Sequence, residues 1–354
     1  MRSRPTVLGA LFATTTAVTW GGQFVVGKSA LDTVNAFPLS TVRYFVASLL
    51  WLAVLWAVEG RRSLLPGGHG LRLFWLGTLG FGGFNLLGFT GLAHARPESA
   101  SLIVALAPLL TALVIWRRTR VRPTTATFAF MALALAGVAL VISAGHPSRI
   151  FSGAIGWGDL LVLAAVFCFV LYGLGAASLP AFSPLRYTAL TASLGWFTLA
   201  GATLAGAVSG LVPMPSTQEL LDVGPQLAYL ALPGAFMAVL TWNASIKLIG
   251  AANTALFGNL IPVTTFAITI AQGYRPGPVE VFGALLTVAA LVANNLVTRR
   301  ASVAESRAVP AEEGDLGQGR EQGLLLPDPD LGVIPRAQVR HGVAVDDHLG
   351  RHVA

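Results

Sequence analysis

The chain has 354 residues, of which 54% are hydrophobic and only 11% are charged, and its mean hydropathy is +0.69. Soluble globular proteins carry about a quarter charged residues. The composition therefore excludes a soluble domain and indicates an all-α integral membrane protein. The single cysteine, Cys168, excludes a disulfide framework and a cysteine-built metal site. We expect no cofactor and no metal.

The net charge of +7 is unevenly distributed along the chain. Residues 1–300 contain 18 lysines and arginines against 7 acidic residues, whereas residues 301–354 contain 5 against 9. The positive-inside rule accounts for the basic excess of the membrane region, so we expect the lipid bilayer and no nucleic acid as its partner. The acidic segment 301–354 is rich in glycine and proline and cannot bury enough apolar surface to offset chain entropy. It is predicted to be a disordered cytoplasmic tail.

Ten apolar segments are long enough to cross a bilayer, which takes roughly 20 residues per helix. The connections are short, so neighbouring helices should pack antiparallel. A cytoplasmic N-terminus places 13 basic residues on the cytoplasmic side and 4 outside, which predicts that both termini are cytoplasmic. The first segment is expected to be retained as a helix and not cleaved as a signal peptide. The predicted spans are 7–30, 38–58, 73–93, 98–116, 124–144, 155–177, 185–208, 226–247, 253–272 and 278–298.

The two halves of the membrane region can be aligned with each other. Residues 85–111 align without a gap on residues 239–265 at a constant offset of 154, and Pro108 then meets Pro262. Each half contains five spans. Because five is odd, the second half enters the membrane from the opposite face, which predicts ten transmembrane helices as two inverted five-helix repeats. The predicted repeats are residues 1–149 and 150–300.

Five short segments occur in a characteristic order: Trp20 to Lys28, Pro38 to Tyr44, Ser99 to Leu110, Gly137 to Val141 and Leu260 to Val263. In this order and spacing the chain resembles the ten-helix EamA-type carriers of the drug/metabolite transporter superfamily. The resemblance covers about residues 7–298 and implies that amino acids, related metabolites or drugs are the substrates. The chain departs from the family where the fourth and ninth spans end, because the usual Gly-Glu turns are missing. No role of those glutamates is carried over.

Enzyme motifs are absent from the sequence, which has no His-Glu-x-x-His, Gly-x-Ser-x-Gly, Cys-x-x-Cys or P-loop. We therefore expect no enzymatic activity. Function should then depend on polar groups within the spans, where they are costly to place and mark binding or transport sites.

Few ionisable residues lie inside the apolar spans. Arg43 lies five residues into the second span, about 7.5 Å from its outer end at 1.5 Å per residue. It is interpreted either as a cationic clamp for a carboxylate or phosphate, or as an anchor that binds backbone carbonyls. Lys28 and Lys247 lie near span ends, where their ammonium groups can reach the interface. Glu98 and Asp159 begin the fourth and sixth spans, where a carboxylate suits the positive end of a helix; helix capping is favoured over a proton relay for both.

Neutral polar and aromatic residues at mid-depth complete the candidate substrate site. Each could hydrogen-bond a substrate or join two helices, and together they fall on spans that could surround one central cavity. Pro108 and Pro262 lie within the fourth and ninth spans, where each frees a backbone carbonyl and permits a hinge. With Arg43, the candidate substrate-binding residues are Trp20, Gln23, Asn85, Tyr172, Trp242, Asn243 and Asn259.

These features predict a secondary transporter of the inner (plasma) membrane that exports a small polar metabolite by alternating access. The substrate class follows from the resemblance and not from the residues. Because no carboxylate lies deep in a span, transport should depend only weakly on a proton gradient. The alternative is a membrane receptor or scaffold that signals through the C-terminal tail. We expect a monomer or a homodimer.

Overall fold

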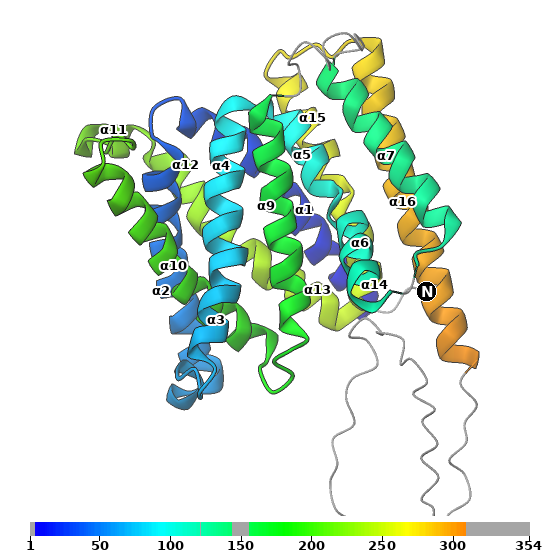
Figure 1. Ribbon diagram of the computed structural model, residues 1–354, viewed down its shortest axis with the longest axis horizontal. Helices are drawn as coiled ribbons and strands as arrows, with labels where there is room; N and C mark the ends of the chain where they lie inside the picture. The colour runs from blue at the N-terminus through cyan, green and yellow to red at the C-terminus, as the bar shows by residue number, and fades with distance from the viewer. Residues whose placement is uncertain (1–3, 121, 144–155, 309–354) are drawn as a thin grey trace, which may run out of the picture. The chain divides into compact units, whose positions relative to one another are not determined.

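The computed structural model describes residues 4–120, 122–143 and 156–308, and these fold into helices without a β-strand (Figure 1). Ten helical spans follow one another, and their bounds differ from the predicted ones by a few residues, apart from the last helix. The first five are α1 (Arg4–Leu31), α2 (Ala36–Glu59), α3 with η2 and α4 (Gly70–Gly77, Thr78–Gly83, Phe84–His94), α5 with α6 (Pro97–Ala105, Ala107–Thr119) and α7 (Thr125–Ser143).

The second half repeats this series of spans. It comprises α9 (Trp157–Ala176), α10 (Pro184–Val208), α12 with η3 and α13 (Gly224–Tyr229, Leu230–Met237, Ala238–Ile249), α14 with α15 (Ala251–Gly258, Leu260–Ala271) and α16 (Pro278–Ala308). Two short helices, η1 (Arg61–Leu64) and α11 (Thr217–Asp222), lie in the connections. Nine of the ten spans are long and apolar enough to cross a membrane. The exception, α1, carries threonines, glycines and Gln23, which lower its hydropathy.

Capping residues explain where several spans begin and end. The side chain of Asn35 accepts a hydrogen bond from the first turn of α2, and Ser183 does the same for α10, which satisfies amide groups that have no partner inside the helix. Pro97 occupies the first turn of α5, where its missing N–H is no loss. Gly60 and Gly250 end α2 and α13 at φ +80°, a conformation that favours glycine.

The last helix extends further than the sequence predicts. Residues 301–308, which the sequence assigns to the tail, continue α16. The rest of the predicted tail, residues 309–354, lies outside the described residues, and so does the predicted boundary between the repeats at residues 149 and 150.

Irregular helix geometry recurs at equivalent places in the two halves. The third span of each half contains a π-helix, η2 in the first half and η3 in the second. The fourth span is interrupted in both halves, at Leu106 before Pro108 and at Asn259 before Pro262. Proline lacks an N–H and its ring crowds the carbonyl four residues earlier, which favours a break at this distance. The shared irregularities support the two-repeat architecture independently of the sequence alignment.

Close helix pairs surround the central spans. In Figure 1, α7 and α16 run side by side, as do α4 with α9 and α2 with α10. Gly137 on α7 and Gly283 on α16 explain the first of these pairs, because a Cβ atom at Gly137 would lie 2.5 Å from the carbonyl oxygen of Gly283. Small residues at such contacts allow the backbones of membrane helices to approach closely.

Candidate functional site

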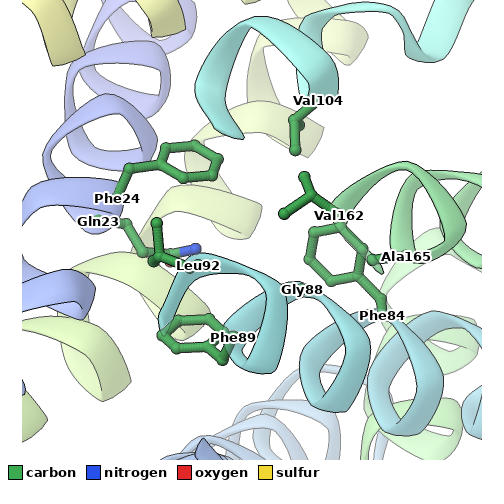
Figure 2. A pocket seen from close by; sticks show the side chains of 9 residues that line it. All are labelled: Gln23, Phe24, Phe84, Gly88, Phe89, Leu92, Val104, Val162 and Ala165. Carbon is green, nitrogen blue, oxygen red and sulfur yellow. The ribbon is translucent and has the colours of Figure 1, made fainter. Parts of the chain in front are cut away.

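A cavity lies between spans one, three, four and six. The space that can hold the centre of a water molecule is about 20 Å³, within about 360 Å³ of empty volume that includes open solvent at the mouth. The walls of the cavity come from α1, α4, α5 and α9 (Figure 2). It is set well within the membrane region, because Gln23 lies eight residues from the end of α1 at Leu31, about 12 Å at 1.5 Å per residue. The lining residues are mostly apolar: Gln23, Phe24, Phe84, Gly88, Phe89, Leu92, Val104, Val162 and Ala165.

Gln23 is the polar side chain of this cavity. Its Oε1 accepts a hydrogen bond of 2.9 Å from Nη2 of Arg43. The bond to Arg43 is the one hydrogen bond found for this side chain among the described residues, and Figure 2 shows Nε2 directed into the space that the lining side chains enclose. Gly234 in η3 leaves room for the amide, since a Cβ atom there would lie 2.8 Å from Oε1. The cavity therefore presents one oriented N–H donor within apolar walls.

Arg43 lies behind Gln23 and is only 2% exposed. Its guanidinium carbon lies 5.0 Å from the ring centroid of Tyr44 and 4.9 Å from that of Phe89, so it is held by two cation–π contacts. Its Nε and Nη1 have no hydrogen-bond partner, and no acidic residue in the described part of the chain forms an ion pair with it. A buried cation without a counter-charge is costly. The interpretation of Arg43 as an anchor on backbone carbonyls is not supported, because no hydrogen bond joins its guanidinium to a backbone carbonyl among the described residues.

Trp20 and Trp242 brace the helices next to the cavity. Nε1 of Trp20 donates to the carbonyl oxygen of Gly234 at 3.1 Å, and the two indole centroids lie 5.4 Å apart. Trp20 thereby fixes the π-helical segment that makes room for Gln23. Gly21 permits this arrangement, because a Cβ atom there would lie 2.7 Å from the carbonyl oxygen of Ile261 on α15.

Asn85 and Tyr172 lie away from the cavity lining. Nδ2 of Asn85 bonds the carbonyl of Phe81 one turn earlier, at 2.8 Å, and its Oδ1 has no hydrogen-bond partner in the described structure. Tyr172 stacks on Tyr187, with centroids 5.1 Å apart, and its hydroxyl accepts a hydrogen bond of 3.4 Å from Thr191. Both residues are buried and belong to the packing of α4, α9 and α10 in this conformation.

Asn259 and Asn243 also lie off the cavity wall. Asn259 occupies the interruption between α14 and α15 and donates to the carbonyl oxygen of Leu256 at 3.0 Å. Asn243 is half-buried on α13. The two predicted hinge residues, Pro108 and Pro262, lie just after the two interruptions. Of the eight predicted binding residues, Gln23 is thus the one on the wall of this cavity, and Arg43 and Trp20 support it.

A second polar cluster, which the sequence analysis missed, joins spans four, five and ten. Nη1 of Arg96 donates to Oε1 of Glu280 at 2.6 Å and to the Tyr274 hydroxyl at 2.9 Å, while Nη2 donates to the carbonyl of Val141 at 2.6 Å. Burial disfavours the charged guanidinium, but the hydrogen bond to Glu280 and the charge interactions with Tyr274, Glu280 and Glu98 together outweigh it and raise the pKa of Arg96. Acidic Glu280 beside Gly277 at the start of a span was the sequence signal of this cluster.

Three further charged residues lie near the same end of the spans. Glu98 and Asp159 occur in the first turns of α5 and α9, as predicted, and are only 3% and 7% exposed. The Asp159 carboxylate accepts a hydrogen bond from the backbone N–H of Gly156, the residue that precedes α9, whereas no side-chain hydrogen bond of Glu98 is found among the described residues. Lys28 donates to the carbonyl oxygens of Leu92 and Ala93 at the end of α4, at 3.0 and 2.6 Å. Its ammonium thus binds a helix C-terminus, where positive charge is favoured.

The chain is similar along most of its length to proteins that are named as transporters. YrdR of Bacillus subtilis, named as an uncharacterized transporter, is 29% identical over 305 residues, which cover 85% of this chain and 95% of that protein. A probable terminal-alkyne amino-acid exporter of Streptantibioticus cattleyicolor is 28% identical over 80% of this chain and 91% of its own length. A solved crystal structure with 22% identity superposes with a TM-score of 0.58 over 85% of this chain and 98% of that chain, which shows a shared fold.

The model of the EamA-like transporter family matches the chain twice, over residues 7–143 and 156–296. Each match takes in five of the observed spans, and together they leave out only the termini and the central connection. The two-fold match, the paired helix irregularities and the ten helical spans of the described residues agree. The chain is a multi-pass membrane transporter and belongs to the EamA-like transporter family.

Proposed function

We propose that this transporter exports a small amino-acid-like metabolite by alternating access and binds it in the cavity at Gln23. The observation that carries the proposal is the buried guanidinium of Arg43, which has no acidic partner and lies directly behind the cavity wall. A carboxylate in the cavity would supply the missing negative charge. The similarity to a protein named as a probable amino-acid exporter supports the same substrate class and the outward direction.

Electrostatics in the membrane interior favour this assignment. An unpaired cation in a medium of low dielectric costs several kcal/mol, and part of that cost is recovered when an opposite charge approaches. The apolar walls exclude water and so strengthen the attraction. Substrate binding would therefore recover part of the desolvation energy of the Arg43 guanidinium. An arginine already paired within the protein would not contribute to binding in this way.

The repeats support alternating access. Both fourth spans are interrupted, and both third spans contain a π-helix, so each half has a deformable segment next to the cavity region. Pro108 and Pro262 would act as the hinges at which each half bends. Rocking of inverted repeats about a fixed site would expose the cavity to each side in turn.

The orientation in the membrane is part of this proposal, with both termini in the cytoplasm of a plasma-membrane protein. It is tested by single cysteines at exposed positions in a Cys168→Ser background. Leu65→Cys, between η1 and α3, should react with an impermeant maleimide only from the cytoplasmic side, and Asp222→Cys, at the end of α11, only from outside. Labelling of both positions from the same side would contradict the inverted arrangement.

The transport proposal is tested by counterflow in proteoliposomes that contain the purified protein. Vesicles preloaded with unlabelled amino acid should accumulate the labelled amino acid transiently, and protein-free vesicles should not. A panel of amino acids and uncharged metabolites of similar size identifies the class. If no amino acid shows counterflow while another solute does, the substrate class is wrong and the transporter assignment stands.

A further inference from the structure

We propose that Nε2 of Gln23 is the hydrogen-bond donor that selects the carboxylate of the substrate, and that Arg43 is a positioning residue that fixes the direction of this amide. The inference rests on the proposed export of amino-acid-like solutes. It assigns a role to each atom of the Gln23 amide and names the substrates as carboxylates with an apolar body.

The direction of the Gln23 amide follows from the chemistry of its neighbour. A guanidinium has N–H donors and no acceptor, so the amide atom that faces Arg43 must be the oxygen. The nitrogen must then face the opposite way, which is into the cavity (Figure 2). Gly234 leaves room for the oxygen, because a Cβ atom at this position would lie 2.8 Å from it. The cavity is consequently built to donate a hydrogen bond at this point and not to accept one.

A donor backed by a positive charge favours an anionic acceptor. Hydrogen bonds to ionised groups are roughly twice as strong as those between neutral groups, and the nearby charge of Arg43 polarises the amide further in the same direction. A carboxylate oxygen fits this donor better than the oxygen of a neutral amide. Because no acidic residue lines the cavity, nothing in the lining repels that carboxylate.

The remaining walls define the other end of the substrate. Phe24, Phe84 and Phe89 bring aromatic rings to the cavity, and Leu92 and Val162 add aliphatic surface. Burial of apolar substrate surface against these side chains is favourable, because it removes that surface from water. An amino acid with an apolar side chain, such as leucine, satisfies both ends of the site, whereas one with a charged side chain does not.

Arg43 acts through Gln23 in this arrangement. Its side chain is not part of the cavity lining, and its Nη2 is already engaged by the amide oxygen. The effect of Arg43 on the substrate should therefore depend on the presence of Gln23. This distinguishes a positioning residue from a direct clamp, for which the two side chains would contribute separately.

The decisive variant is Gln23→Glu, which replaces the donor by an acceptor of the same size. One oxygen of the new carboxylate would pair with Arg43 and the other would face the cavity. We expect the dissociation constant for L-leucine on purified protein to rise roughly tenfold to hundredfold, and the preference for L-leucine over L-leucinamide to be lost or reversed. The melting temperature should rise, because Arg43 gains a counter-charge. A general defect would instead lower both binding and stability.

The matched control is Gln226→Glu on α12, the same substitution away from the cavity lining. It should leave the ratio of the leucine and leucinamide dissociation constants unchanged. Gln23→Met removes the donor without adding a charge, and it tests the same role if Gln23→Glu does not fold. It should weaken leucine binding and leave leucinamide binding nearly unchanged.

The positioning role of Arg43 is tested by a double-mutant cycle. If Arg43 acts through Gln23, Arg43→Met should weaken leucine binding in the wild-type background and add less than about twofold in the Gln23→Met background. Independent, multiplicative effects would overturn the positioning role. A Gln23→Glu variant that keeps the wild-type preference would overturn the selectivity role. Wild-type protein that binds neither compound and shows no counterflow of any amino acid would instead overturn the proposed function.

Discussion

Arg43 and Arg96, two arginines of the membrane region, differ in what surrounds them. Arg96 lies at the end of its span and meets an acid, a phenol and a carbonyl, with Glu280 at 2.6 Å. Arg43 lies within its span, is almost fully buried, and meets one neutral amide and two aromatic rings. The same side chain is thus neutralised by the protein in one place and left without a counter-charge in the other.

This difference is the basis for the binding site that we propose at Gln23. A satisfied guanidinium ties helices together and gains nothing from a ligand, whereas an unsatisfied one is stabilised when an anion arrives. The surroundings of Arg96 join three spans and a connection, which explains its role as a cross-link. The surroundings of Arg43 adjoin a cavity, and for this reason we propose that the substrate is recognised there.

The largest expected effect comes from removing the unpaired cation. Arg43→Met should weaken leucine binding roughly tenfold to hundredfold, because the Gln23 amide loses its orientation and its charged neighbour. The melting temperature should not fall, since removal of an uncompensated buried charge offsets the loss of the Gln23 contact and the cation–π contacts. Affinity and melting temperature measured on the same monodisperse sample decide this. A large fall in melting temperature with normal binding would make Arg43 a structural residue like Arg96.

The reverse pattern is expected for the paired arginine. Breaking a fully buried ion pair costs about 3–5 kcal/mol, but the Arg96 side chain is 39% exposed, so solvent screening reduces the expected loss to about 1–3 kcal/mol. Arg96→Met should therefore lower the free energy of unfolding by that amount and leave leucine affinity in the folded carrier unchanged. Arg96→Met combined with Glu280→Met should be more stable than Arg96→Met alone, because no buried carboxylate is left unpaired. Denaturant titration of the three proteins tests this, and additive losses would contradict the pairing.

A smaller effect is expected from pH at the Arg96 cluster. Burial raises the pKa of Tyr274 to about 12, and the hydrogen bond to Glu280 adds to this shift, whereas a tyrosine in the unfolded chain titrates near about 10. The folded state thus favours the protonated phenol, and this stabilisation is complete below about pH 10 and lost as the pH rises through 12. The melting temperature of Tyr274→Phe should fall less steeply than that of the wild type between these values. Parallel curves would show that Tyr274 does not contribute.

The smallest effect is expected from a proton gradient. The buried carboxylates Glu98, Asp159 and Glu280 lie near span ends, and none lines the cavity or pairs with Arg43. An imposed pH step should therefore drive little uphill movement of leucine in proteoliposomes, and Asp159→Asn should leave counterflow intact. Strong accumulation that follows the pH step and disappears in Asp159→Asn would show that the paired end of the molecule is coupled to transport.

Much of the architecture was predictable from the sequence because lipid imposes simple rules on it. Apolar length fixed the spans to within a few residues, and the matched Pro108 and Pro262 indicated the repeat whose interruptions the structure shows. The helical extension of residues 301–308 was not predicted, because these residues do not form an apolar segment that would indicate a membrane helix. The π-helices η2 and η3 were not predicted either, because their geometry depends on neighbouring helices.

The sequence by itself determined that polar residues such as Gln23, Arg43 and Asn85 are exceptional, because each is costly in an apolar span. Only the tertiary structure decided which of them face a cavity. Hydropathy measures how costly a side chain is in lipid, but its partner depends on helix rotation and on contacts between residues far apart in sequence. Arg96 and Glu280 are 184 residues apart in the sequence and form an ion pair because the packing brings their spans together. Arg43 contacts Gln23 and two aromatic rings instead. The difference between the paired Arg96 and the unpaired Arg43 is therefore a property of the packing and not of the residue.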